Sequence, residues 1–168
     1  MNITIRKAKL GDEKILAYIQ TESWKSAFAD IISAEDMTRC TDIAKVETMY
    51  ENDLKSGYYE KSILEIDGKP HCIAAWGKAR NPQFSDCAEL ICIHSLSENR
   101  GKGYGSIMMN YILDEIKNSE YNSVILWVFE KNTRARRFYE KHGFELTENT
   151  LIAYNAVEVM YRKDFDVK

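Results

Sequence analysis

The sequence contains few cysteines and histidines and no long apolar run. Its 168 residues include four cysteines and three histidines, and no two cysteines form a CxxC pair. Zinc sites and disulfide frameworks need closer or more regular spacing, so we predict no metal. No segment has the length and apolarity of a membrane span, and the first residues, MNITIRKAKLGDEK, are too polar for a signal peptide. We therefore predict a cytoplasmic protein that has no membrane partner.

A large excess of charge of either sign is also lacking. The chain has 23 Lys and Arg residues against 26 Asp and Glu residues, a formal net charge of −3 at pH 7. Nucleic-acid binders usually present a strongly positive face, so a nucleic-acid partner is not expected. A hydrophobic content of 45% and a charged content of 29% are typical of a folded protein. Only two prolines and no repeat or linker interrupt the chain, so we predict a single domain over residues 1–168.

Hydrophobic periodicity predicts strands and helices in a mixed α/β order. Seven segments have the alternating or continuous apolar pattern of strands, at residues 2–7, 62–66, 71–78, 88–95, 124–129, 144–146 and 153–162. Helical spacing occurs after Asp12, within residues 33–55, after Tyr104 and after Asn132. The dipeptide Asp67-Gly68 is a hairpin turn signal between the second and third strands. We expect the strands to form one mixed sheet with helices packed against it.

A glycine-rich loop lies between the predicted strand at 88–95 and the helix that follows it. The loop reads Arg100-Gly101-Lys102-Gly103-Tyr104-Gly105-Ser106. Glycines let a backbone approach a ligand closely, and the N–H groups at a helix start attract an anion such as a pyrophosphate. Because Ser106 follows Gly105, the loop does not fit the GxGxxG fingerprint, and no GxxxxGK[ST] run occurs. The alternative interpretation is a turn that binds no ligand.

A second motif follows about one helix and one strand later. The apolar strand Leu126-Trp127-Val128-Phe129 precedes the pattern Asn-x-x-Ala-x-x-Phe-Tyr-x-x-x-Gly-Phe, formed by Asn132, Ala135, Phe138, Tyr139, Gly143 and Phe144. Considered singly, Asn132 is a helix N-cap, Gly143 a helix stop and Phe138 a core residue. Composition alone also makes Tyr139 a core residue.

Together the two motifs resemble the signatures of the GNAT N-acetyltransferase superfamily. The loop is similar to that family's Arg/Gln-x-x-Gly-x-Gly/Ala acyl-CoA loop, and the second motif is similar to its Asn and Phe-Tyr signature. The resemblance implies the fold class α/β (α+β), with a mixed, mostly antiparallel central sheet of about seven strands flanked by about four helices. It also implies an acyl-CoA N-acyltransferase that uses acetyl-CoA as cosubstrate. The resemblance covers the carboxy-terminal half closely and the amino-terminal half only in the order of its elements.

The resemblance also implies roles for individual residues. The cofactor-binding residues would be Ile93, His94, Ser95, Arg100, Gly101, Lys102, Gly103, Tyr104, Gly105, Ser106, Asn132 and Tyr139. Tyr139 stands where the family has its general acid and would protonate the departing thiolate. Glu89, on the central strand, is the predicted general base, with Glu98, His94 or a water chain as alternatives. A carboxylate at the start of a strand that is only solvated or paired is the other interpretation of Glu89.

The sequence constrains the acyl acceptor less closely. The family binds its acceptor with the N-terminal helices and the loop before the last strand, which implies acceptor contacts from Trp24, Phe28 and Tyr154. Aromatic side chains suit a small amine, although core packing explains them equally well. We predict transfer to a primary amine of a small molecule by direct attack in a ternary complex. The alternatives are a protein or aminoacyl-tRNA acceptor, and a sensor that binds acyl-CoA without turnover. A homodimer is compatible with the resemblance.

Overall fold

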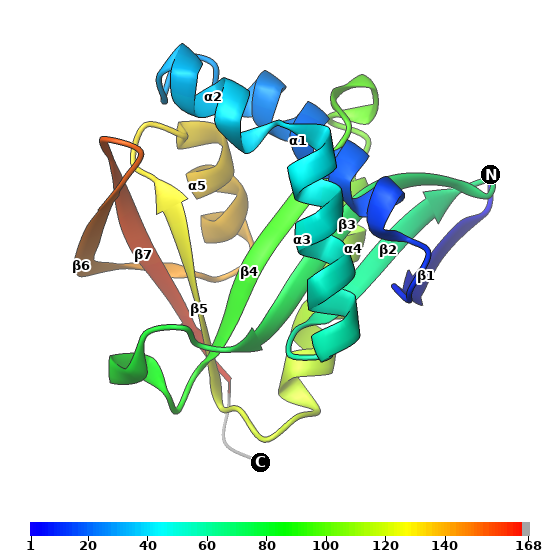
Figure 1. Ribbon diagram of the computed structural model, residues 1–168. Coiled ribbons are helices and arrows are strands. Elements are labelled where there is room, and N and C mark those ends of the chain that lie inside the picture. Colours follow the sequence, from blue (N-terminus) through cyan, green and yellow to red (C-terminus); the bar gives the residue numbers. More distant parts are fainter. Residues whose placement is uncertain (166–168) are drawn as a thin grey trace.

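The computed structural model describes residues 1–165, apart from the side chain of Asn99, and shows a seven-stranded sheet with helices on both faces (Figure 1). The strands are β1 (Ile3–Lys7), β2 (Glu60–Ile66), β3 (Lys69–Lys78), β4 (Ala88–Ser95), β5 (Ser123–Phe129), β6 (Glu145–Ala153) and β7 (Ala156–Asp164). The α-helices are α1 (Glu13–Ala27), α2 (Ala34–Cys40), α3 (Ile43–Ser56), α4 (Tyr104–Lys117) and α5 (Thr133–Lys141). No helix within residues 1–165 is long and apolar enough to cross a membrane.

The sheet has the strand order β1-β2-β3-β4-β5-β7-β6. Every neighbouring pair is antiparallel except β4 and β5, which are parallel. This arrangement confirms the predicted mixed, mostly antiparallel sheet of about seven strands. The β2–β3 hairpin turns at Asp67 and Gly68, whose φ angles of 50° and 78° are those that an Asp-Gly turn signal predicts.

Two elements differ from the sequence-based expectation. The helical region 33–55 is two helices, because α2 ends at Cys40 and the Asp42 side chain accepts a hydrogen bond from Lys45 N to begin α3. The sheet is therefore flanked by five α-helices, one more than predicted. Strand β6 extends over nine residues, although only residues 144–146 were predicted as strand. β6 is an edge strand, and its exposed polar residues hide the apolar alternation that predicts a strand.

Each face of the sheet carries its own apolar layer. On one face, Met108 and Ile112 of α4 are fully buried against Leu64, Leu126 and other side chains of the main core cluster. On the other face, helices α1 and α3 cover the amino-terminal half of the sheet (Figure 1), and Leu16, Ile19 and Val46 form a second cluster there. Near β5 and β7 a smaller cluster, which includes Cys87, Ile125 and Met160, covers part of this face. The face between the two clusters remains available for a cavity.

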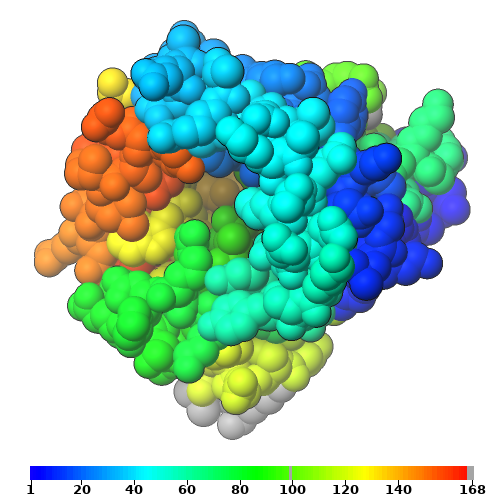
Figure 2. Space-filling view, viewed as in Figure 1, coloured from blue at the N-terminus to red at the C-terminus, as the bar shows by residue number. Residues whose placement is uncertain are grey.

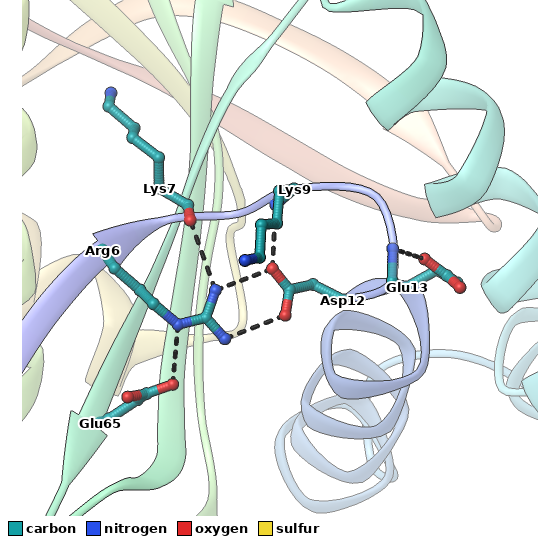
Figure 3. Close-up of polar contacts among 7 residues, drawn as sticks. Arg6, Lys7, Lys9, Asp12, Glu13 and Glu65 are labelled. Atoms are coloured by element: carbon teal, nitrogen blue, oxygen red, sulfur yellow. Dashed lines mark hydrogen bonds and ion pairs between the residues drawn. The ribbon is translucent and has the colours of Figure 1, made fainter.

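A charged network joins the first strand to the first helix. The Arg6 guanidinium donates to both carboxylate oxygens of Asp12, at 2.8 and 2.9 Å, and its Nε donates to Glu65 at 2.9 Å (Figure 3). The backbone N–H of Lys9 also donates to Asp12, at 2.9 Å. The Arg6 guanidinium lowers the pKa of the Asp12 carboxyl, which is almost fully buried. This network fixes the position of α1 against β1 and β2.

We expect the substitution Asp12→Asn to destabilise the fold. The variant removes a nearly buried carboxylate that accepts from two Arg6 nitrogens and the Lys9 N–H, while Arg6 itself is partly exposed and keeps Glu65. The free energy of unfolding at pH 7 should therefore fall by about 1 to 2 kcal/mol. The Asp12 pKa is lower in the folded state, so its stabilisation is present above its unfolded pKa of about 4 and disappears as the pH falls through the folded value. Urea unfolding of both proteins should therefore show a difference at pH 7 that shrinks below about pH 4. An equal difference at every pH would contradict this account.

Candidate active site

Strands β4 and β5 pair only at one end and then separate. The two strands are in register at Ala88–Val124 and at Glu89–Ile125, and no further pairs follow. The register of β4 against β3 shifts between Leu90 and Cys92, which indicates a β-bulge at Ile91. Since bulges bend a strand, the rest of β4 diverges from β5. The edge of β4 that faces β5 therefore presents backbone groups of Ile91–Ser95 that β5 does not pair.

The glycine loop lies at the carboxy-terminal end of β4 and begins α4. Gly101 and Gly103 have φ angles of 79° and 85°, and no atom lies within 4 Å of a Cβ built at either position. Gly103 is the N-cap of α4 and provides no side-chain cap. The first N–H groups of this 14-residue helix therefore attract an anion, as the sequence predicts.

Helix α5 brings the second motif next to the loop. The Asn132 side chain accepts a hydrogen bond from Ala135 N at 3.2 Å and begins the helix, as predicted for an N-cap. The Phe138 ring lies 3.6 Å from the position of a Cβ on Gly105, so a larger residue there would crowd the contact between α4 and α5. Gly143, with a φ of 80°, ends the helix as predicted.

Tyr139 lines a cavity, and its hydroxyl has no hydrogen-bond partner among the described residues. Its ring packs against the main core cluster and contacts Phe138 and Phe144, at 5.6 and 6.0 Å between ring centroids. Burial, and to a smaller extent the nearby Cys92 thiol, raise the pKa of Tyr139, so the phenol is protonated at pH 7. A protonated, unpaired hydroxyl is suited to donate a proton.

The separated strands open into a cavity of about 1270 Å³. In the space-filling view the molecule is hollowed between the cyan α3, the green segment before β4 and the orange β6 (Figure 2). The predicted site residues that line it are Trp24, Phe28, Glu89, Ile93, His94, Ser95, Arg100, Gly101, Gly103, Tyr104, Gly105, Ser106, Asn132, Tyr139 and Tyr154. Lys102 and Glu98 are not in its wall. The Tyr104 ring belongs to the main core cluster, so only part of this residue faces the cavity.

Glu89, the predicted base, is fully buried and paired with Arg80. One carboxylate oxygen accepts from the Arg80 Nε at 3.0 Å and Nη2 at 2.5 Å, and the other accepts from the Arg80 backbone N–H at 2.8 Å. Both carboxylate oxygens therefore already accept hydrogen bonds from Arg80, which makes Glu89 less able to accept a proton from a substrate. The role of Glu89 as general base stays a prediction. His94 is neutral at pH 7, because burial lowers its pKa to about 4, and it is therefore a weak base.

Four aromatic side chains meet at one end of the cavity. Trp24 and Phe28 come from α1 and its end, Phe129 from the end of β5, and Tyr154 from the β6–β7 turn. Their rings contact edge to face, at 5.0 Å for Trp24–Phe28, 5.7 Å for Trp24–Tyr154 and 5.0 Å for Phe28–Phe129. Tyr154 has a φ of 53°, which is strained for a bulky side chain and costs about 1 kcal/mol or more. This strained turn keeps the Tyr154 ring against Trp24.

Some charged residues in the cavity wall were not predicted. Arg134 and Lys141 lie on α5, with Arg134 close to Arg100; Arg80 contacts Glu89, and Glu158 lies opposite Phe129. Burial and the neighbouring Arg100 lower the pKa of Arg134, which shows that two cations stand close together. Arg134, Lys141 and Glu158 have no predicted role, because none of them is a defined position of either motif. Only the three-dimensional arrangement brings them to one cavity.

A family model described as "Acetyltransferase (GNAT) family" matches residues 19–144, three quarters of the chain. The chain belongs to the GNAT family of acetyltransferases. A probable N-acetyltransferase of Mycobacterium tuberculosis is 28% identical over 96% of this chain and 93% of its own length. The N-acetyltransferase YuaI of Bacillus subtilis is 25% identical over 77% of this chain and 73% of its own length. The matched region includes both the glycine loop and the second motif.

Solved structures of GNAT-fold proteins superpose over nearly the whole chain. The PaiA N-acetyltransferase of Thermoplasma acidophilum, solved in complex with coenzyme A, has a TM-score of 0.83 at 20% identity and covers 98% of this chain and 100% of its own. YncA of Salmonella typhimurium, a putative acetyltransferase solved with acetyl-CoA, has a TM-score of 0.76 at 18% identity. The superposition covers 100% of this chain and 96% of YncA. At these identities the likeness establishes the GNAT fold of this acetyltransferase. It does not assign roles to individual residues of the cavity.

Proposed function

We propose that this GNAT protein transfers the acetyl group of acetyl-CoA to a primary amine of a small molecule. The observation that carries the proposal is that the glycine loop and the unpaired Tyr139 hydroxyl face one cavity. A cavity of about 1270 Å³ is large enough to hold a cosubstrate and a small acceptor together. This arrangement supports direct attack in a ternary complex, without a covalent enzyme intermediate.

The residues at the loop fit a CoA pyrophosphate. Gly101 and Gly103 leave open space beside the backbone, and the α4 N-terminus attracts negative charge. Arg100, Arg134 and Lys141 add three cations that no carboxylate of the described residues pairs. Within residues 1–165, apart from the Asn99 side chain, the Arg100 guanidinium donates to the Ser26 hydroxyl alone, at 2.5 Å. Phosphate groups of the cosubstrate would pair with these three cations, which have no carboxylate partner in the described part of the chain.

The chemistry requires a neutral amine, a stabilised oxyanion and a protonated leaving group. An alkylamine has a pKa of about 10, so a proton must leave before the nitrogen attacks the thioester carbonyl. Backbone N–H groups along the unpaired edge of Ile91–Ser95 suit the negative charge that develops on the carbonyl oxygen. Tyr139 would then donate its proton to the coenzyme A thiolate, whose pKa is about 8.5 by analogy with cysteine. Glu89 stays the predicted proton acceptor and would have to loosen its contact with Arg80 to act.

An assay of thiol release tests this proposal. Purified protein would be mixed with acetyl-CoA and a panel of small primary amines, and free thiol would be followed with time. We expect release that depends on both the amine and the protein. Calorimetric binding of acetyl-CoA without release for any small amine would instead favour a protein or aminoacyl-tRNA acceptor, or a sensor. Absence of binding would contradict the proposal. The predicted single domain, cytoplasmic location and homodimer stay predictions.

A further inference from the structure

Most charged side chains in the cavity wall already have a partner of opposite charge. Arg80 pairs with Glu89, Lys61 with Asp53, Arg39 with Asp36 and Lys45 with Asp42. The remaining charges of the wall lie on different elements. Arg100, Arg134 and Lys141 leave an excess of positive charge on the glycine loop and α5. Glu158 leaves one negative charge on β7, beside the aromatic rings.

Glu158 projects from β7 toward the aromatic end of the cavity. In the β5–β7 ladder it lies directly opposite Phe129, so both side chains are on the same face of the sheet. Phe129 contacts Phe28 on that face, and Glu158 is part of the same wall. The carboxylate is half-buried and forms no hydrogen bond or ion pair with a described residue. A half-buried carboxylate is only partly solvated, so a cationic ligand that enters the cavity can pair with it at a smaller desolvation cost than at a fully exposed site.

The surroundings of Glu158 favour a cation over a second carboxylate. Burial raises the pKa of Glu158; Arg80 opposes the rise, and Glu89 adds to it to a smaller extent than Arg80 opposes it. Arg80 contacts Glu89 at 2.5 and 3.0 Å, so these two charges form one ion pair. Glu158 remains the carboxylate beside the aromatic rings that has no ion-pair partner among the described residues. The aromatic rings beside it offer apolar contact and attraction for an ammonium group.

We propose that Glu158 binds the ammonium group of the acyl acceptor, and that the acceptor is an amine on an aromatic or aliphatic body with no carboxylate next to the amine. The inference rests on the proposed function, because it assigns the aromatic end of the cavity to the acceptor. Trp24, Phe28, Phe129 and Tyr154 would contact the apolar body. A carboxylate beside the amine would lie close to Glu158 and be repelled by it.

Binding of two matched probes tests the inference without requiring catalysis. Phenethylamine and phenylalanine differ only in the carboxylate beside the amine, and each would be titrated calorimetrically into protein saturated with coenzyme A, which has no acetyl group to transfer. We expect phenethylamine to bind at least about tenfold more tightly than phenylalanine. Glu158→Gln should weaken the binding of phenethylamine by about tenfold to 100-fold while the Kd of coenzyme A remains unchanged.

The control is Glu148→Gln, which removes the same charge from an exposed position of β6 outside the cavity wall. It should leave the binding of phenethylamine unchanged. Equal binding of phenethylamine by the native protein and Glu158→Gln, or tighter binding of phenylalanine, would overturn the inference. Neither result would affect the proposed function if other amines still release thiol. Loss of thiol release with every amine would instead refute the proposed function, while the binding data still decide whether Glu158 holds an ammonium.

Discussion

The substitution Gly103→Glu should abolish acetyl-CoA binding, with a rise in Kd of at least about 100-fold in calorimetric titration. Gly103 stands at the N-terminus of α4, and the space beside its Cα is open. A glutamate side chain would project into this space, where it would bring a carboxylate next to the pyrophosphate. Like charges at such a distance repel strongly in a partly enclosed site. The added carboxylate would also satisfy the helix N-terminus that the pyrophosphate otherwise occupies.

Two variants separate this electrostatic effect from backbone strain. Gly68→Glu introduces the same residue at a nearly identical φ, 78° against 85°, in the β2–β3 turn away from the cavity. Gly103→Ala introduces the strain without the charge. We expect Gly68→Glu to bind acetyl-CoA normally and Gly103→Ala to lose at most about tenfold in affinity, from strain of about 1 kcal/mol. Normal binding by Gly103→Glu would exclude the loop from the cosubstrate site.

The substitution Tyr139→Phe should lower the rate of acetyl transfer by about 100-fold or more under single-turnover conditions. The variant removes only the hydroxyl, and this hydroxyl has no partner among the described residues, so no polar group inside the fold loses its bond. The ring would keep its contacts with Phe138 and Phe144. We therefore expect the Kd of acetyl-CoA and the free energy of unfolding to change little.

Tyr121→Phe is the matched control for this variant. Tyr121 also packs against the main core cluster, and it is not part of the cavity wall. The control should transfer acetyl groups at the native rate. An unchanged rate for Tyr139→Phe would show that another group, or water, protonates the thiolate. A fall in rate accompanied by a large loss of stability would indicate a structural role for the hydroxyl.

The sequence predicted the fold most reliably where local rules and burial agree. The central strand β4, the Asp67-Gly68 turn and the apolar face of α4 all follow from periodicity and turn chemistry. Ile107 is an exception: its helical spacing from Tyr104 and Tyr111 predicts a buried position in α4, but its side chain is 39% exposed. Most of β6 was missed, since an edge strand pairs through its backbone and needs few apolar side chains.

The sequence predicted the cavity residues that belong to contiguous motifs more readily than the pairing of charges in the wall. The glycine loop and the Asn132–Phe144 motif are contiguous, so their residues and spacing carry the resemblance to the family signatures. Arg80 and Glu89 lie on opposite sides of the connection between β3 and β4. Whether they form an ion pair depends on the directions of their side chains, which the sequence does not show. Glu158 can be assigned to the cavity wall only once the register of β5 and β7 is known, because that register places it opposite Phe129. Such contacts depend on tertiary structure and leave no local pattern in the chain.

The central claim is that one cavity, between the glycine loop and Tyr139, binds acetyl-CoA for transfer. A crystal structure of the protein with acetyl-CoA tests it most directly. We predict a pyrophosphate against the backbone of Gly101 and Gly103, and a thioester sulfur within about 3.5 Å of the Tyr139 hydroxyl. A cosubstrate bound elsewhere, or a thioester far from Tyr139, would contradict the account.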